Sequence, residues 1–448
     1  MVHEALRTLL DALEVVRPAF TRPGHANLVV VFAGWALTAG PHAVTQALVT
    51  TGVAGRRHHE AFHRFFSRGT WEPDEVGRLL FRWISRHLPR GAAIRVVLDD
   101  TLATKKGPHV FGIGSHLDAV RSTRRQKIFA FGHCWVVLAV LLPVPFSSRV
   151  FALPVLFRLY RTVKSCERAD QQHRKKTQLA RDLLDVLATW VGNQRVELAA
   201  DGAYCNDTIM RGLPSNFVLF GAMRPDAVLT ALPPARSRKP GRPSRRGRTV
   251  AKPEAIAKDG RRPWLSCEAQ LYGVRRVVRF KTVDAQWYRA CGVGLLRIVV
   301  VKVEGGTIGT RVFFSTDATL DVPRILETYA GRWAIEVCFR DLKQLLGFGD
   351  SSARKRAAVE RTAPFVGFVY TTLVLWFSEG IYRTRIAAPP LRPWYAHKRG
   401  LCFADVLRTA QRALMPLDVL DPRRSLGNLP KPRMRHAPPR DPGLRRAA

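Results

Sequence analysis

Residues 94–101 read Ile94-Arg-Val-Val-Leu-Asp99-Asp100-Thr101, and residues 196–204 read Val196-Glu-Leu-Ala-Ala-Asp201-Gly-Ala-Tyr204. In each stretch a short apolar run, typical of a buried strand, ends in acid. Acids at the ends of neighbouring strands can converge above a sheet. Because successive side chains of a strand point to opposite faces, Asp99 and Asp100 cannot both face such a site. For either strand-end acid taken singly, a turn or cap role is the commoner one.

The apolar pattern predicts further strands on both sides of these two. Strands are expected over 128–142, 149–160 and 217–221, and a helix over about 171–191. The longest apolar stretch, 134–145, is too short for a membrane helix and ends at prolines, which favours a strand buried on both faces. Three strands, a helix and a further strand predict an α/β fold with a mixed sheet and flanking helices. This pattern is compatible with a ribonuclease-H-like catalytic core.

Composition and periodicity divide the chain into five regions. We predict a helical N-terminal DNA-binding domain over 1–90, the first part of the core over 91–224, a basic linker with a β-rich insertion over 225–318, a helical completion of the core over 319–385, and a C-terminal region with a disordered basic tail over 386–448.

The charge balance points to a nucleic-acid partner. The 448 residues include 72 Lys and Arg against 35 Asp and Glu, a formal net charge of +37. Self-repulsion of this size opposes a compact state unless a polyanion neutralises it, and nucleic acid is the commonest large polyanion in cells. The seven cysteines lie far apart without a CxxC pair, which argues against a zinc or disulfide framework. With no secretory signal visible, we expect a cytoplasmic, nucleoid-associated bacterial protein.

A third acid stands in a motif with helical spacing. Residues 329–343 read Tyr329-Ala-Gly-Arg332-Trp-Ala-Ile-Glu336-Val-Cys-Phe-Arg-Asp-Leu-Lys343. On one continuous helix the tyrosine, arginine, glutamate and lysine would share an arc of roughly 60°. A carboxylate for a metal, with nearby cations and a hydroxyl for phosphates, suits phosphoryl transfer on DNA. The alternative is a surface helix on which Arg332 and Glu336 form an ordinary i,i+4 pair.

This helix resembles the Y-(2)-R-(3)-E-(6)-K signature of bacterial insertion-sequence transposases in the DDE superfamily. The strand ends resemble the Asp-Thr and Asp-Gly-x-Tyr motifs of that family, here Asp100-Thr101 and residues 201–204. The resemblance covers about 55–380. Lys105-Lys106-Gly107 also looks like the basic stretch that follows the first acid in relatives, whereas Leu102 departs from the smaller residue common there.

The resemblance implies a role for each matching residue. Asp100, Asp201 and Glu336 would be the catalytic and metal-binding acids, holding two Mg²⁺ ions, with Mn²⁺ as a substitute; Asp99 stays open as an alternative first ligand. DNA contacts are expected from Tyr329, Arg332, Lys343, Lys105 and Lys106. The implied function is Mg²⁺-dependent cleavage and strand transfer at the ends of an insertion sequence, by cut-and-paste transposition. The partners would be double-stranded DNA, at both element ends and target, and a second copy of the chain in a synaptic complex, with no membrane.

Two further residues, Arg242 and Trp287, have sequence contexts that indicate DNA binding less specifically. Arg242 lies in a Gly-Arg-Pro centre of the basic linker and would suit a narrow minor groove, although a solvated basic loop explains it as well. Trp287 could stack on an unpaired base or be an ordinary core residue.

Other functions remain open at this stage. The chain could be a non-catalytic DNA-binding protein or a ribonuclease-H-fold nuclease that cuts without joining. A remote alternative is a zinc metalloprotease, because His59-Glu60-Ala-Phe-His63 fits the H-E-x-x-H pattern. The surrounding Arg56, Arg57 and Arg64 form a cationic setting that disfavours Zn²⁺.

Overall fold

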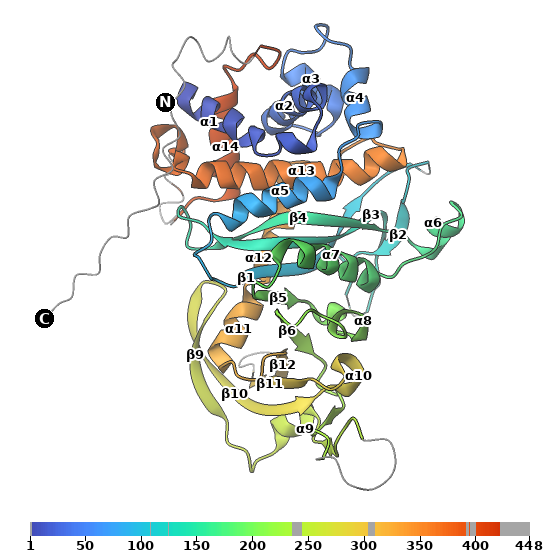
Figure 1. The fold of residues 1–448 in the computed structure, drawn as a ribbon, viewed down its shortest axis with the longest axis vertical. Coiled ribbons are helices and arrows are strands. Elements are labelled where there is room, and N and C mark those ends of the chain that lie inside the picture. The colour runs from blue at the N-terminus through green and yellow to red at the C-terminus, as the bar shows by residue number, and fades with distance from the viewer. Residues whose placement is uncertain are drawn as a thin grey trace, which may run out of the picture.

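The computed structural model describes residues 2–107, 109–123, 125–234, 244–302, 310–390, 394 and 400–421. Helices from both ends of this part of the chain form one layer (Figure 1). α2 is apolar on all sides and is buried at the centre of the layer, as expected for a core helix. The bounds are α1 (Val2–Glu14), α2 (Arg22–Leu37), α3 (Val44–Thr50), α4 (Glu60–Ser67), α5 (Pro73–Ser85), α13 (Arg356–Ser378) and α14 (Phe403–Leu414).

The helical character predicted for 1–90 is present, and these helices pack directly on the rest of the protein. α1 contacts α13 and α14, while α5 and α13 both cover strand β4. α5 approaches β4 closely because position 77 is glycine: a Cβ atom there would lie 2.0 Å from the carbonyl oxygen of Val155. Within the described ranges, no helix combines the length and the apolar character needed to cross a membrane.

The sheet begins with a group of strands that contains the predicted acids. β1 is antiparallel to β3, and β3 is antiparallel to β4 and β2; on its other side β1 is parallel to β5, and β5 is parallel to β6. The predicted mixed α/β architecture is therefore confirmed. The bounds are β1 (Ile94–Thr104), β2 (Gly114–Leu117), β3 (Phe129–Pro143), β4 (Val150–Tyr160), β5 (Val196–Ala200) and β6 (Phe217–Met223).

The strands expected in an insertion continue this sheet. β12 pairs with β6, with Val312 opposite Met223. Among the described residues, twelve strands join into one sheet in the order β2-β3-β1-β5-β6-β12-β11-β10-β7-β8, with β4 on β3 and β9 on β10. Pairing with β12 covers the edge of β6 that would otherwise be exposed. The bounds are β7 (Leu229–Thr230), β8 (Thr249–Val250), β9 (Leu265–Leu271), β10 (Val274–Gln286), β11 (Leu295–Lys302) and β12 (Thr310–Ser315).

The remaining helices lie beside the sheet or between its strands. They are α6 (Val163–Glu167), α7 (Lys176–Val191), α8 (Asp207–Met210), α9 (Pro253–Lys258), α10 (Tyr288–Cys291), α11 (Val322–Ala330) and α12 (Trp333–Leu345), with short 3₁₀ turns at η1 (Arg17–Ala19), η2 (Gly202–Tyr204), η3 (Ile381–Arg383) and η4 (Arg385–Ala387).

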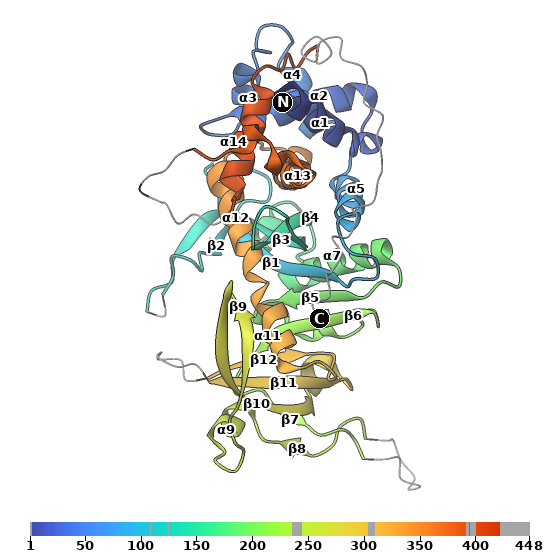
Figure 2. The same ribbon diagram turned by 90° about the vertical axis from the view of Figure 1, so that its left-hand side faces the viewer.

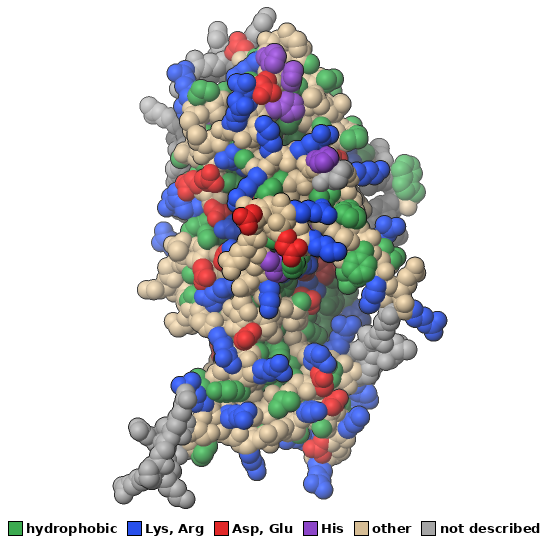
Figure 3. Space-filling view, turned by 90° about the vertical axis from the view of Figure 1, so that its right-hand side faces the viewer, with side chains coloured by type: hydrophobic (Ala, Val, Ile, Leu, Met, Phe, Trp, Pro, Cys, Tyr) green, Lys and Arg blue, Asp and Glu red, His purple; other side chains and the backbone are tan. Residues whose placement is uncertain are grey.

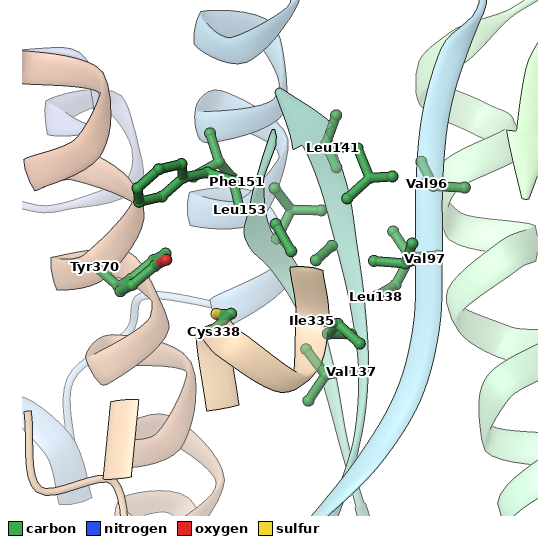
Figure 4. Packing of buried hydrophobic residues seen from close by; sticks show 14 of the residues in the cluster. Val96, Val97, Val137, Leu138, Leu141, Phe151, Leu153, Ile335, Cys338 and Tyr370 are labelled. Carbon is green, nitrogen blue, oxygen red and sulfur yellow. The ribbon is translucent and has the colours of Figure 1, made fainter. Parts of the chain in front are cut away.

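The continuous helix expected over 329–343 is divided in two. α11 ends at Ala330 and α12 begins at Trp333, because around Gly331 the backbone makes tighter bonds, with the amide of Arg332 donating to the carbonyl of Tyr329. α11 packs mainly on β9, whereas α12 packs on β4 and β1. Figure 4 shows Ile335 and Cys338 of α12 between the sheet and α13. These apolar contacts fix the position of α12 over β1.

Candidate active site

Asp99 of β1 and Glu336 of α12 are joined by one guanidinium group. Arg332 donates from Nη1 to Asp99 Oδ2 at 2.6 Å and from Nη2 to Glu336 Oε1 at 2.9 Å. The Arg332 side chain is 15% exposed and that of Asp99 is 18% exposed. The Arg332–Glu336 pair is therefore linked to Asp99 of a strand. An ordinary i,i+4 pair on a surface helix would have no such third partner.

Asp201 lies next to this group. The parallel pairing of β1 and β5 ends at Leu98 and Ala200, and Asp99 and Asp201 are the next residues. β5 ends at that point, whereas β1 continues to Thr104, so Asp99 lies within its strand and not at the strand end that the apolar run predicted. The pKa of Asp99 is raised to about 6, chiefly by burial. Arg332 and the backbone amide of Asp100, which donates to Asp99 Oδ1, oppose this shift, and the negative charges of Asp100 and Asp201 add to it. Three carboxylates thus share one region, with one arginine between two of them.

Asp100 occupies the other face of β1. Its carboxylate accepts hydrogen bonds from Lys176 Nζ at 2.6 Å, from the Tyr204 hydroxyl at 2.7 Å and from Cys134 Sγ at 3.3 Å. Of the two candidate first acids, Asp99 is the one that contacts Arg332 and, through it, Glu336, whereas Asp100 lies on the opposite face. The physical reason is the alternation of side chains along a strand, which directs the two acids to opposite faces.

Lys176 and Tyr204 are two partners of Asp100 to which sequence reasoning assigned no role. Tyr204 belongs to the 201–204 motif, and its hydrogen bond to Asp100 ties the turn after β5 to β1. The pKa of its hydroxyl is raised, first by burial and then by the negative charge of Asp100. Its place in the motif was a usable signal, whereas nothing in the sequence around Lys176 marked it as a partner of Asp100.

The other predicted members of the helix motif, Tyr329 and Lys343, have different surroundings. The Tyr329 ring packs on Phe313, with 4.8 Å between ring centroids, and the Arg332 guanidinium carbon lies 5.9 Å from the Tyr329 ring. Burial raises the pKa of Tyr329 to about 12, so its hydroxyl stays protonated as a donor at neutral pH. Lys343 stands in the last turn of α12, exposed, in a groove that His42 and Gln411 also line.

The basic stretch after β1 divides between two environments. Lys105 Nζ donates to the backbone carbonyl of Ser351, and burial lowers the pKa of Lys105 to about 8. Lys106 is exposed. Lys105 therefore joins the end of β1 to the loop after α12, and only Lys106 is exposed to solvent. Arg242 lies outside the described residues.

Glu60 of the H-E-x-x-H pattern and Trp287 both make contacts with other side chains of the protein. The His59 and His63 rings meet edge to face with centroids 5.7 Å apart, and Glu60 bonds Arg64 at 3.0 Å on the exposed side of α4. The Trp287 ring meets Phe314 edge to face at 5.8 Å, which favours the core reading of this tryptophan. Within the described ranges, no group of three or more His, Cys, Asp or Glu side chains is preformed as a metal site.

The chemistry of the acids nevertheless fits a divalent cation. Mg²⁺ prefers carboxylate oxygens together with retained water. In the structure the positive charge between Asp99 and Glu336 comes from the Arg332 guanidinium. Carboxylates that already share one cation have the donor type and the charge that a metal ion requires. A metal could therefore bind there if Arg332 releases one or both acids.

Two family models match parts of the chain. A family model described as "DDE superfamily endonuclease" matches residues 16–277, more than half of the chain, including both strand-end acids. The chain belongs to the DDE superfamily. A second model, described as "Archaeal putative transposase ISC1217", matches residues 291–376, which include the helix motif. The protein is therefore a DDE superfamily endonuclease or transposase, a class of enzymes that use divalent metal.

The DDE superfamily enzyme was also compared with solved structures and with curated proteins. A piggyBac transposase synaptic complex with hairpin DNA, determined by cryo-EM, is similar at 10% sequence identity with a TM-score of 0.44, covering 88% of this chain and 71% of that chain. No curated protein matches the chain.

Proposed function

We propose that this DDE superfamily enzyme is an insertion-sequence transposase of the Y-(2)-R-(3)-E-(6)-K group, which binds element ends and cuts and joins DNA strands with Mg²⁺. The observation that carries the proposal is the bridge from Arg332 to Asp99 and Glu336, beside Asp201 at the end of the neighbouring parallel strand. This bridge brings the helix motif and the strand-end motifs to one place.

The strand order supports a ribonuclease-H-like core for the proposed enzyme. Three antiparallel strands in the order β4-β3-β1 are followed by β5 and β6, both parallel to β1. The β1–β5 pairing ends at Leu98 and Ala200, so Asp99 within β1 and Asp201 after β5 follow at the same level of the sheet. α12 packs on β1, and its Glu336 is linked to Asp99 through Arg332. This arrangement supplies two acids from strands and one from a helix.

The proposed metal-binding acids are Asp99, Asp201 and Glu336, with Asp99 in place of the Asp100 expected from the motif. Asp100 already has an ammonium, a hydroxyl and a thiol as partners, so its negative charge is compensated on the other face of β1. When bound, two Mg²⁺ or Mn²⁺ ions would activate a water or 3′-hydroxyl and stabilise the leaving oxygen in an in-line displacement.

Arg332 and Tyr329 would act on the DNA strand. A guanidinium presents a planar fork of donors that matches two phosphate oxygens, so Arg332 can exchange carboxylates for a phosphate without losing hydrogen bonds. The protonated hydroxyl of Tyr329 can donate to the same phosphodiester region. Both side chains would position the scissile phosphate, and Arg332 would also offset charge in the transition state.

DNA is the proposed partner because the positive charge is distributed over the surface. Lys and Arg side chains are spread over the face shown in Figure 3 and outnumber the acids there. Lys106 and Lys343 are exposed, one after β1 and the other on α12. Neutralising phosphates with such residues releases counterions and gives sequence-independent affinity. A synaptic complex would hold two copies of the chain on two element ends.

Cleavage and joining on DNA that carries the sequences flanking the gene tests the proposal. We expect Mg²⁺-dependent nicking followed by strand transfer, both lost in Asp201→Asn and Glu336→Gln while DNA affinity stays within a few fold of that of the wild type. Asp185→Asn, which removes an exposed carboxylate paired with Arg181, is the matched control and should cut normally. Cutting without joining would identify a nuclease, and metal-dependent cutting by either acid variant would remove the assignment.

A further inference from the structure

Three apolar side chains are exposed together on the β2–β3 hairpin. Leu117 is 47% exposed and Phe129 and Phe131 are each 63% exposed. Leu117 pairs with Phe129, and Ser115 with Phe131, so all three side chains stand on one face of the hairpin. We call Leu117, Phe129 and Phe131 the hairpin patch. Neighbouring exposed aromatic side chains of this kind mark a contact surface more often than a single exposed residue does.

The hairpin patch lies on the same face of the sheet as Asp99. Asp99 is opposite Val137, and Phe131 and Phe129 follow at even spacing along β3, without an irregularity in the β1–β3 or β2–β3 pairing. At about 3.3 Å per residue, the phenylalanines are on the order of 20 to 26 Å from Asp99. Figure 2 shows β2 and the following loop extending outward on the side of the sheet where α12 lies.

The charges around the hairpin patch are positive. Arg121, Arg125 and Lys127 are exposed between the two strands. The acid of this turn, Asp118, accepts hydrogen bonds from the backbone amides of Val120 and Arg121, so it closes the turn. The hairpin therefore presents cations for phosphates beside rings for bases. A second copy of the chain would bring another net charge of +37 against it, which opposes direct self-association.

We propose that the hairpin patch binds the DNA strand a short distance from the scissile phosphate, an inference that rests on the proposed function. Phe129 and Phe131 would contact bases, either by stacking on unpaired ones or as a wedge between base pairs. Arg121, Arg125 and Lys127 would hold the backbone. In B-form DNA, the separation from Asp99 corresponds to about six to eight nucleotides of one strand.

DNA affinity of the Phe129→Ala/Phe131→Ala double variant tests the proposal. The probes are a fluorescent single strand of about 30 nucleotides and the duplex made from it, a length beyond typical single-strand site sizes. We expect affinity to fall about ten-fold or more, because stacking on aromatic rings contributes strongly per base. The slope of log affinity against log salt concentration should not change in the double variant, since no charge is removed. Arg125→Ala should instead flatten this slope by about 0.9 on the duplex.

Controls separate the hairpin from folding and from the proposed function. Val293→Ala removes an equally exposed apolar side chain elsewhere and should leave affinity unchanged. A larger loss on the single strand indicates stacking, and a larger loss on the duplex indicates a wedge. Affinity within two-fold of wild type on both probes, at unchanged melting temperature, overturns the proposal. The proposal is also overturned if the wild type is a dimer without DNA and the double variant is a monomer. Wild-type cleavage measured in parallel tests the proposed function separately.

Discussion

Arg332 and Asp99 form a hydrogen-bonded ion pair of 2.6 Å although they are 233 positions apart in the chain. Because Arg332 also holds Glu336, the carboxylate of the helix motif is tied to the middle of β1. Asp99 is the acid of the Asp99-Asp100 pair that takes part. The two faces of β1 therefore differ in chemistry, with an arginine against Asp99 and a lysine, a tyrosine and a cysteine against Asp100.

Asp99→Asn and Asp100→Asn should have different effects. We expect Asp99→Asn to abolish cleavage with DNA affinity within a few fold, because the acid facing Glu336 loses its charge. Asp100→Asn should cost about 1 to 2 kcal/mol of stability, since the partly exposed Lys176 loses its ion pair, and should keep cleavage within about ten-fold. Cleavage kinetics and urea unfolding measure both. Loss of cleavage in Asp100→Asn, with retention in Asp99→Asn, would restore Asp100 as the first ligand.

Arg332→Ala should lower the cleavage rate by ten-fold or more, equivalent to about 1.4 kcal/mol of barrier, because the scissile phosphate loses a positioning guanidinium. Arg332→Lys should recover part of the rate, since an ammonium restores the charge without the planar fork. Single-turnover cleavage of bound DNA is the measurement. The control is Arg174→Ala, because Arg174 pairs with Asp182 on the surface. Equal rates for wild type and Arg332→Ala would reduce the bridge to a structural ion pair.

Glu60→Ala should cleave at the wild-type rate without added zinc. The Glu60 carboxylate pairs with Arg64 on the exposed side of α4 and has no described partner in the candidate active site. Cleavage assays and metal analysis of the purified protein test this together. A folded Glu60→Ala protein that is inactive, or one bound zinc per chain in the wild type, would revive the metalloprotease alternative.

Acid should weaken the fold through His133. Its Nε2 lies 2.8 Å from the carbonyl oxygen of Phe111, and burial lowers its pKa to about 4. The pKa of this histidine is lower in the folded than in the unfolded state. Such a group contributes its full stabilisation above the unfolded pKa of about 6.5, and this contribution is lost as the pH falls toward 4. The loss approaches about 1.4 kcal/mol per pH unit between these values.

Urea unfolding at about pH 7.5 and about pH 5 measures the effect of His133. His133→Gln keeps a donor for Phe111 but cannot titrate, so its stability should fall less between the two pH values than that of wild type. Parallel losses in both proteins would place the acid sensitivity in other groups.

Gly77→Ala should destabilise the protein by about 1 to 3 kcal/mol, because the new Cβ would overlap the carbonyl oxygen of Val155 where α5 crosses β4. Helix propensity alone favours alanine by about 1 kcal/mol, so the sign of the change distinguishes close packing from propensity. Thermal and urea unfolding provide the measurement. Gly40→Ala is the control, since a Cβ there meets nothing within 4 Å; a more stable Gly77→Ala protein would mean that α5 moves away at little cost.

Local pattern predicted several elements closely but not all of them: the strand expected over 94–98 continues to Thr104, and the helix expected from about 171 begins at Lys176. β5 has the bounds expected from its apolar run, and β3 and β4 differ from the predicted strands by one residue at most at either end. Arg332 and Glu336 stand one helical turn apart whatever their surroundings, so their contact follows from spacing alone. The helix break at Gly331 was missed because one glycine within a helical pattern is compatible with a continuous helix.

Tertiary structure decided which acid contacts Arg332 and how the strands and helices join. Val96, Val97 and Leu98 are all fully buried, so β1 shows no alternation of polar and apolar residues that would mark one face. Only the packing of α12 on one face and α7 near the other separates Asp99 from Asp100. The continuation of the sheet from β6 to β12 likewise depends on a pairing between segments about ninety residues apart. Such pairings depend on three-dimensional partners, which hydrophobic periodicity along the chain does not encode.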